Sequence, residues 1–169
     1  MRRIGLALCI LFLSSSPSYA ALRTSDVAPA FSLPDLNGGT FVLRDVLQSG
    51  RRAAAGGVVL CFFATWCGPC RKELPILNGL AGELKVKGVE VVIVDLKEDP
   101  AVVRRFARAL SLDKVTVLSD RDGKAAAQYQ VRFLPTTFCI GADGRIKDMI
   151  YGEVRSADEF RKCAAKLFP

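Results

Sequence analysis

The sequence Val58-Val-Leu-Cys-Phe-Phe-Ala-Thr-Trp-Cys-Gly-Pro-Cys70 begins with seven consecutive apolar residues. A run of this length without polar alternation is typical of a strand that is buried on both faces of a sheet. A helix is expected directly after it, because Pro69 suits a first helical turn and apolar residues recur at helical spacing from Leu74 to Leu84. The two cysteines are therefore predicted at the carboxyl end of a central strand, which is where ligand-binding and active sites of open α/β sheets lie.

The segments on either side predict a continued alternation of strands and helices. Upstream, residues 28–45 carry short apolar runs around Asn37-Gly38-Gly39, which indicates a β-hairpin, and a loop is expected from there to Gly57. Further strands are predicted over residues 89–96, 115–118, 136–141 and 145–151, and further helices from Pro100, over 124–129 and from Ser156. The last helix should open with a capping box formed with Glu159. This order predicts α/β architecture, with a mixed sheet covered by helices on both faces.

Composition narrows the class of protein. The chain has 169 residues, half of them hydrophobic, and no linker long enough to divide it, so one globular domain is expected over residues 21–169. The 24 basic and 17 acidic residues include no run of five like charges, which predicts a solvated basic surface and no nucleic-acid partner. Histidine is absent from the sequence, which excludes imidazole as a general base or metal ligand.

The first 20 residues have the pattern of a secretory signal peptide. Arg2 and Arg3 precede an apolar stretch from Ile4 to Leu13, and a polar segment follows that ends at Ala20. An uncleaved membrane anchor is the alternative, but the stretch has about ten residues and a spanning helix needs about 20. We therefore expect residues 1–20 to be removed and the protein to be periplasmic or otherwise extracytoplasmic.

The cysteine pattern favours one catalytic pair. Loss of Cys9 with the signal would leave five cysteines, and an odd number scattered through a domain of this size is not a disulfide framework. We expect the three cysteines outside the motif to be buried solitary thiols on apolar faces, with a regulatory disulfide among them as the alternative; they are Cys61, Cys139 and Cys163.

The pair Cys67-Gly-Pro-Cys70 could serve several kinds of chemistry, and the neighbouring residues separate them. Covalent haem attachment needs histidine directly after the second cysteine, where this chain has Arg71. A zinc site needs two more ligands at paired spacing, which the remaining cysteines do not offer. Redox chemistry fits best, because backbone amides at a helix start favour the thiolate of Cys67, and Cys70 can then resolve a mixed disulfide.

Two sequence motifs resemble a known family. Trp66-Cys-Gly-Pro-Cys70 with Pro75 beyond it is similar to the thioredoxin motif, and the runs Ala28-Pro-Ala-Phe-Ser-Leu33 and Cys70-Arg-Lys-Glu-Leu-Pro75 resemble the extracytoplasmic TlpA/ResA-like branch. This resemblance covers residues 27–168. It implies a thioredoxin fold with an N-terminal β-hairpin and a central strand-helix insertion between Val89 and Leu112. It also implies a thiol-disulfide oxidoreductase that needs no cofactor and no metal.

The resemblance assigns roles to residues outside the cysteine pair. Leu134 and Pro135 match the family's cis-proline loop, which together with Trp66 shapes the surface that binds substrate. Thioredoxins carry a buried acid at the position of Cys61, so the proton acceptor for Cys70 must lie elsewhere. Glu73 is the candidate, because the TlpA/ResA-like branch has glutamate there, one helical turn after the second cysteine. The alternative is a surface glutamate paired with Lys72 or solvent.

The expected function is reduction of disulfides in extracytoplasmic proteins, because Gly68-Pro69 between the cysteines is typical of reductants. Apocytochrome c is a common substrate in the family, an upstream membrane electron donor is implied, and a monomer is expected. A peroxiredoxin-like peroxidase is one alternative, although Ala64 stands where that family has threonine. A metal-delivery or interaction module is another, although such modules use Cys-x-x-x-Cys and a distant histidine.

Overall fold

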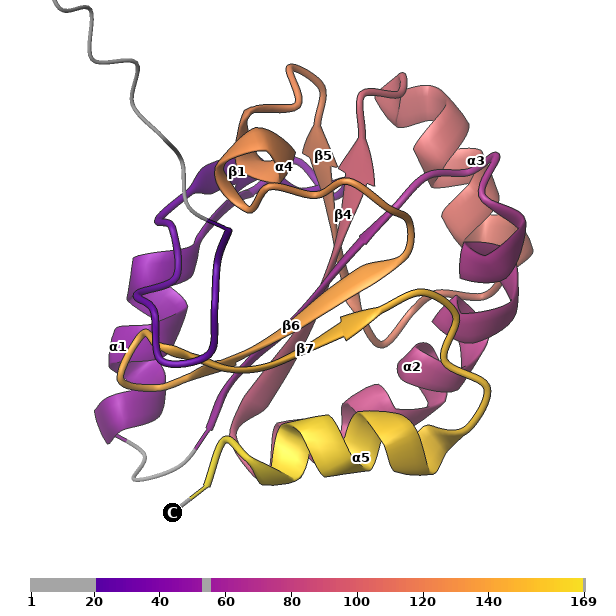
Figure 1. Cartoon of the computed structure of the whole chain (residues 1–169). Coiled ribbons are helices and arrows are strands. Elements are labelled where there is room, and N and C mark those ends of the chain that lie inside the picture. Colours follow the sequence, from indigo (N-terminus) through magenta and orange to yellow (C-terminus); the bar gives the residue numbers. More distant parts are fainter. Residues whose placement is uncertain (1–20, 53–55, 169) are drawn as a thin grey trace, which may run out of the picture.

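The computed structural model describes residues 21–52 and 56–168 (Figure 1), so the predicted signal peptide lies outside the described residues. The centre of the molecule is a five-stranded sheet of β3 (Gly57–Phe63), β4 (Val89–Leu96), β5 (Thr116–Asp120), β6 (Thr136–Gly141) and β7 (Ile146–Tyr151). The strand order is β5-β4-β3-β6-β7; β3 pairs parallel with β4 and β4 with β5, while β6 is antiparallel to both β3 and β7. The mixed α/β sheet predicted from the sequence is therefore confirmed.

Five helices and a small hairpin complete the described chain. The helices are α1 (Leu43–Arg52), α2 (Gly68–Val86), α3 (Pro100–Ala109), α4 (Lys124–Gln128) and α5 (Ala157–Ala165). The hairpin pairs β1 (Ser32–Pro34) with β2 (Thr40–Val42), as predicted, and an isolated bridge from Asp35 to Leu118 places it against β5. The strand and helix predicted between Val89 and Leu112 are present as β4 and α3. Within the described residues, no helix is both long and apolar enough to cross a membrane.

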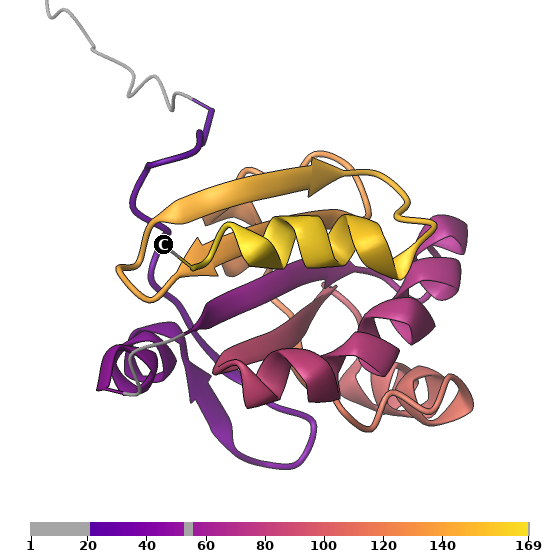
Figure 2. The ribbon, with the colours of Figure 1, turned by 90° about the horizontal axis from the view of Figure 1, so that it is seen from below.

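Strand β3 separates two hydrophobic cores because its side chains alternate between the faces of the sheet. Val59, Cys61 and Phe63 pack in the core that contains residues of α2, α3 and α5. Val58, Leu60 and Phe62 pack in the core that contains residues of α1, α4 and the hairpin. Every residue of β3 is buried, as its unbroken apolar sequence predicts. Figure 2 shows α2 and α5, which contact each other, side by side on one face of the sheet.

Helix α1 lies where the sequence analysis expected a loop. Leu43 and Leu47 are four residues apart and both buried, at 1% and 8% exposure, so one stripe of the helix packs against the sheet. The signal was present in the sequence, because apolar residues at this spacing with acidic Asp45 in the first turn are typical of a helix start. The expected loop was therefore wrong.

The start of α5 also differs in detail from the prediction. Ser156 is the residue before the helix, as expected, but its side chain does not accept a hydrogen bond from a helix amide. Its hydroxyl lies 3.3 Å from Glu159 Oε1, and the same oxygen accepts the backbone N–H of Arg155. Neither bond of the capping box forms, because Glu159 accepts the N–H of Arg155, one residue before the N-cap.

Candidate active site

The cysteine pair lies where β3 passes into α2. Cys67 is the N-cap of α2, and its Sγ accepts the backbone N–H of Cys70 at 3.2 Å. The two residues form a disulfide with a Cα–Cα distance of 5.3 Å. Cys67 is 5% exposed and Cys70 is fully buried, so Cys67 offers the more accessible sulfur. The backbone amide at Cys67 Sγ is the kind of partner that favours a thiolate at this position.

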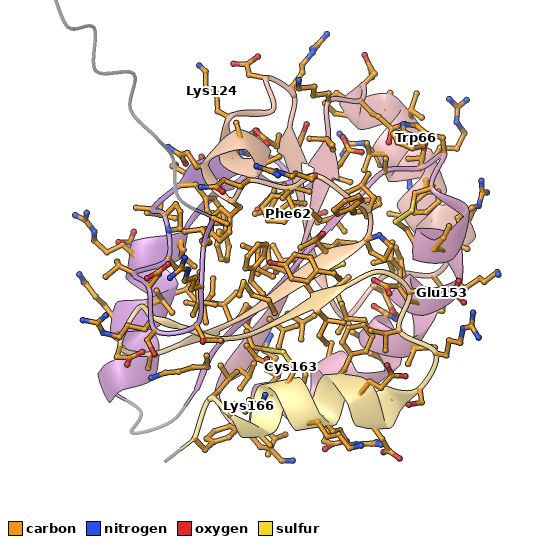
Figure 3. The ribbon with its side chains drawn as sticks, in the orientation of Figure 1. Phe62, Trp66, Lys124, Glu153, Cys163 and Lys166 are labelled. Atoms are coloured by element: carbon orange, nitrogen blue, oxygen red, sulfur yellow. A yellow bond between two sulfur atoms is a disulfide. The ribbon has the colours of Figure 1, made fainter. Side chains whose placement is uncertain are left out.

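A groove opens beside Cys67. Its volume is about 350 Å³, and its lining consists of Trp66, Cys67, Gly68, Pro69, Leu96 and residues 131–134. Trp66 is 71% exposed at this edge of the molecule (Figure 3). Trp66 and Leu134, both predicted from the sequence, therefore line one groove. Pro135 follows directly, its peptide bond with Leu134 is cis, and its carbonyl accepts the N–H of Gly152 at 2.9 Å.

The loop before the cysteines is held by an acid that the sequence analysis missed. The carboxylate of Glu98 accepts both the N–H and the hydroxyl of Thr65, each at 2.5 Å. The N–H of Glu98 in turn donates to Asp95 Oδ2 at 3.1 Å. Burial and the neighbouring Glu98 carboxylate raise the pKa of Asp95 to about 8. Glu98 follows β4 at the carboxyl edge of the sheet, which is the signal that could have identified it.

Glu73 is fully buried, in the early turns of α2. Its Oε2 accepts the N–H of Val154 at 2.8 Å, and its Oε1 lies 3.4 Å from the Sγ of Cys61. The alternative of a surface glutamate is therefore wrong, and Lys72 lies 3.7 Å from Glu153 instead. Because Glu73 follows Cys70 by three residues on one helix, the two are neighbours on its surface.

The environment of Glu73 places its titration near neutrality. Burial raises the pKa of its carboxyl group to about 7, and the charges of Glu153 and Glu159 act in the same direction. The hydrogen bonds from Val154 and Cys61 partly oppose this rise. Both the acid and the carboxylate of Glu73 are therefore available near pH 7, which suits a group that exchanges protons.

The other cysteines do not all behave as predicted. Cys139 and Cys163 were expected to be solitary thiols, but they form a disulfide that joins β6 to α5 across a Cα–Cα distance of 6.1 Å. The bond is drawn at Cys163 in Figure 3, away from Trp66. Both residues are buried against the same core as α2. The count of cysteines misled the prediction, because two pairs and one buried free thiol, Cys61, also give five.

Similarity to known proteins identifies the family of this chain. A profile of the AhpC/TSA family matches residues 24–149, about three quarters of the chain. The chain belongs to the AhpC/TSA family. In Bacillus cereus, the thiol-disulfide oxidoreductase ResA is 39% identical to it over 126 residues, which cover 75% of this chain and 68% of that protein. A ResA from Bacillus thuringiensis is 36% identical over 142 residues, covering 84% and 77% of the two chains.

Solved structures agree with the sequence relatives. A thiol:disulfide interchange protein DsbE from Chlorobium tepidum has a TM-score of 0.74 and 32% identity, covering 86% of this chain and 99% of its own. Peroxidoxin BcpB from Mycobacterium tuberculosis has a TM-score of 0.71 and 29% identity, with 86% and 96% covered. The thioredoxin fold and the similarity to TlpA/ResA-like oxidoreductases, both inferred from the motifs, are confirmed by these findings.

Proposed function

We propose that this thiol-disulfide oxidoreductase works outside the cytoplasm and reduces disulfides in other exported proteins through Cys67 and Cys70. The observation that carries the proposal is the disulfide at the start of α2, with its more accessible sulfur beside a groove and a cis Leu134–Pro135 bond. The relatedness to ResA supports it, as does the signal-like pattern of residues 1–20 in the sequence.

The reaction has two exchange steps. In the reduced protein, the Cys67 thiolate attacks one sulfur of a substrate disulfide, forms a mixed disulfide and releases the other sulfur as a thiolate. The Cys70 thiolate then attacks the Sγ of Cys67, which releases the second substrate thiolate and closes the Cys67–Cys70 disulfide. Two electrons pass to the substrate, and each substrate thiolate takes up a proton. A dithiol protein in the membrane, which is the proposed upstream donor, returns the two electrons.

Glu73 supplies proton transfer for the second step. Cys70 is fully buried, so its thiol loses a proton slowly unless a base stands close by. The carboxylate of Glu73, one helical turn away, takes this proton and passes it on as the substrate leaves. A group with a pKa of about 7 can complete this cycle at neutral pH.

The groove binds the part of the substrate around its disulfide. Trp66 and Phe133 are 71% and 67% exposed and offer apolar surface in a groove whose lining also includes the charged side chain of Arg132. Leu134 and Pro135 complete the wall and present backbone groups to an extended segment. Apocytochrome c, whose thiols must be reduced before haem attachment, is the substrate that the family resemblance favours.

Trapping tests this proposal. A Cys70→Ala variant cannot resolve the mixed disulfide, so it should accumulate covalent complexes with exported proteins, while a Cys67→Ala/Cys70→Ala control should capture none. Equilibration with glutathione buffers should give a reduction potential near about −270 mV. A potential near about −120 mV, as for strong oxidants, would mean that the protein forms disulfides rather than reducing them.

Peroxidase activity is the second candidate, because the family profile is AhpC/TSA and BcpB, a peroxidoxin, shares the fold at 29% identity. Ala64 argues against it, because it replaces the threonine that peroxiredoxins carry three residues before the peroxidatic cysteine. Consumption of hydrogen peroxide by the reduced protein measures this activity. We expect a rate no higher than that of an ordinary thiol, and a peroxide rate exceeding the disulfide rate would reverse the ranking.

A further inference from the structure

The buried thiol of Cys61 has no part in the exchange steps above. It lies in the middle of β3, pairs in register with Ile93 of β4 and Thr137 of β6, and has no exposed surface. It is free of any disulfide. Burial raises the pKa of this thiol well above its ordinary value, and the charge of Glu73 raises it further. Cys61 therefore keeps its proton throughout the neutral range and remains a hydrogen-bond donor.

Cys61 and Val154 contact the carboxyl group of Glu73 from two sides. The Sγ of Cys61 lies 3.4 Å from Oε1, and the N–H of Val154 lies 2.8 Å from Oε2, so each carboxyl oxygen has its own partner. Cys61 belongs to β3, whereas Val154 belongs to the segment between β7 and α5. The hydroxyl of Thr137 is in turn a hydrogen-bond partner of the Cys61 thiol. These contacts fix the carboxyl group against rotation about the end of its side chain.

The charges near Glu73 come from one side of the site. Glu153 precedes Val154, and Glu159 lies in the first turn of α5. Lys72 and Arg155 lie 3.7 and 3.6 Å from the Glu153 carboxylate and offset part of its charge. On the side of the sheet, the described group that hydrogen-bonds to Glu73 is the thiol of Cys61, which is uncharged. A change at Cys61 therefore alters one hydrogen bond to Glu73 without altering any of these charges.

We propose that Cys61 is a positioning residue for Glu73, whose S–H group donates to Oε1 and holds the carboxyl group in the orientation that exchanges a proton with Cys70. The inference rests on the proposed role of Glu73. It gives a function to the position at which the sequence departs from thioredoxins: the carboxyl group comes from α2 instead of β3, and the strand supplies the donor that orients it. An S–H donor is weak, so its effect should be modest but measurable.

The test is the pH profile of the second exchange step, followed by stopped flow in the full chain after loading a model disulfide onto Cys67. Cys61→Val removes the donor, which destabilises the carboxylate. The apparent pKa should rise by about half a unit to one unit, and the rate at pH 7 should fall about two- to fivefold. Cys61→Ser restores a donor and should return the apparent pKa to the original value or below. Val59→Ala, on the same face of β3, is the packing control and should leave the pKa unchanged.

Three results would overturn the inference, and they can be told apart. If Glu73→Gln abolishes the pH dependence but the Cys61→Val profile superimposes on the original, Cys61 only fills space. If Glu73→Gln changes nothing, the proposed role of Glu73 fails and the positioning role fails with it. Should Cys61→Val not fold, NMR titration of the Glu73 carboxyl carbon in Cys61→Ala, which also lacks the donor, provides the readout. An unchanged titration there would likewise overturn the inference.

Discussion

The described part of the chain contains two disulfides whose surroundings differ in almost every respect. Cys67–Cys70 spans three residues at the start of α2, and its first sulfur lies beside a groove. Cys139–Cys163 spans 24 residues, joins β6 to α5, and has both ends at 0–1% exposure. A partner protein can therefore reach the sulfur of Cys67, whereas the sulfurs of Cys139 and Cys163 are out of reach. In the proposed mechanism, accessibility and the nearby backbone amides, rather than the bond itself, decide which disulfide exchanges.

The two disulfides also differ in what they do for stability. By chain entropy, closing a loop of about four residues contributes about 2 kcal/mol, whereas a loop of about 25 residues contributes about 3 to 4 kcal/mol. The longer bridge ties α5 to the sheet. Because Val154 lies just before α5 and donates to Glu73, this bridge also steadies one wall of the proposed acid-base site. In the proposed function, the Cys139–Cys163 disulfide therefore supports the exchange at Cys67–Cys70 without taking part in it.

The largest effect is expected from removing the nucleophile of the Cys67–Cys70 disulfide, which should separate the two disulfides most clearly. Cys67→Ser should lower the rate of protein disulfide reduction by at least about a thousandfold, because it removes the nucleophile that starts both steps. The rate is measured with a model protein disulfide and excess reductant. Cys139→Ala/Cys163→Ala is the matched comparison and should retain activity within about threefold at a temperature where it is folded. Equal losses in both would mean that the two disulfides are not functionally distinct.

The next effect concerns stability. Cys139→Ala/Cys163→Ala should lower the free energy of unfolding by about 3 kcal/mol, seen as a lower urea midpoint in the oxidised state. Cys67→Ala/Cys70→Ala should cost about 2 kcal/mol or less, because its loop is short. An unchanged midpoint in the first variant would show that the bridge between β6 and α5 does not stabilise the native protein.

The sequence singled out the Cys67–Cys70 pair and missed the Cys139–Cys163 disulfide for a physical reason. The bounds of β3, α2 and β4 follow from apolar runs and helical spacing that are local to each segment. The approach of Cys139 to Cys163 depends instead on how β6 and α5 pack together. The contact between Glu73 and Val154 joins residues 81 apart, and that between Thr65 and Glu98 joins residues 33 apart. Such contacts leave no periodic pattern, so sequence could nominate Glu73 as an acid but could not name its partners.

A third effect is expected at Glu73. This residue links the two disulfides, because it follows Cys70 on α2 and accepts the N–H of Val154 just before α5. Its pKa in the folded protein, about 7, exceeds the ordinary value of 4.5, so the folded state favours the protonated group. The resulting stability is present below about pH 4.5 and is lost as pH rises through 7. Glu73→Gln removes this loss, so the variant should be more stable than the original at pH 8 by up to about 3 kcal/mol. Both should have the same stability near pH 4. Equal urea midpoints at pH 8 would contradict the raised pKa.

The smallest effect concerns the rate. Glu73→Gln should slow the second exchange step by at least about tenfold near pH 7, because it keeps the shape of the side chain but cannot take the proton of Cys70. The first step, attack by Cys67, should change by less than about threefold. Stopped-flow traces between pH 5 and 9 separate the two steps. A parallel slowing of both would indicate a disturbed structure instead of lost proton transfer.

Mapping the cysteines by differential alkylation tests the contrast between the two disulfides most directly. The native protein is treated with a mild dithiol at pH 7, alkylated with a light reagent, then denatured, fully reduced and alkylated with a heavy one before mass spectrometry. We predict the light label on Cys67 first and on Cys70 more slowly, and the heavy label on Cys61, Cys139 and Cys163. Light label on Cys139 or Cys163 at the rate of Cys67, or a Cys67–Cys70 bond that stays closed, would contradict the account.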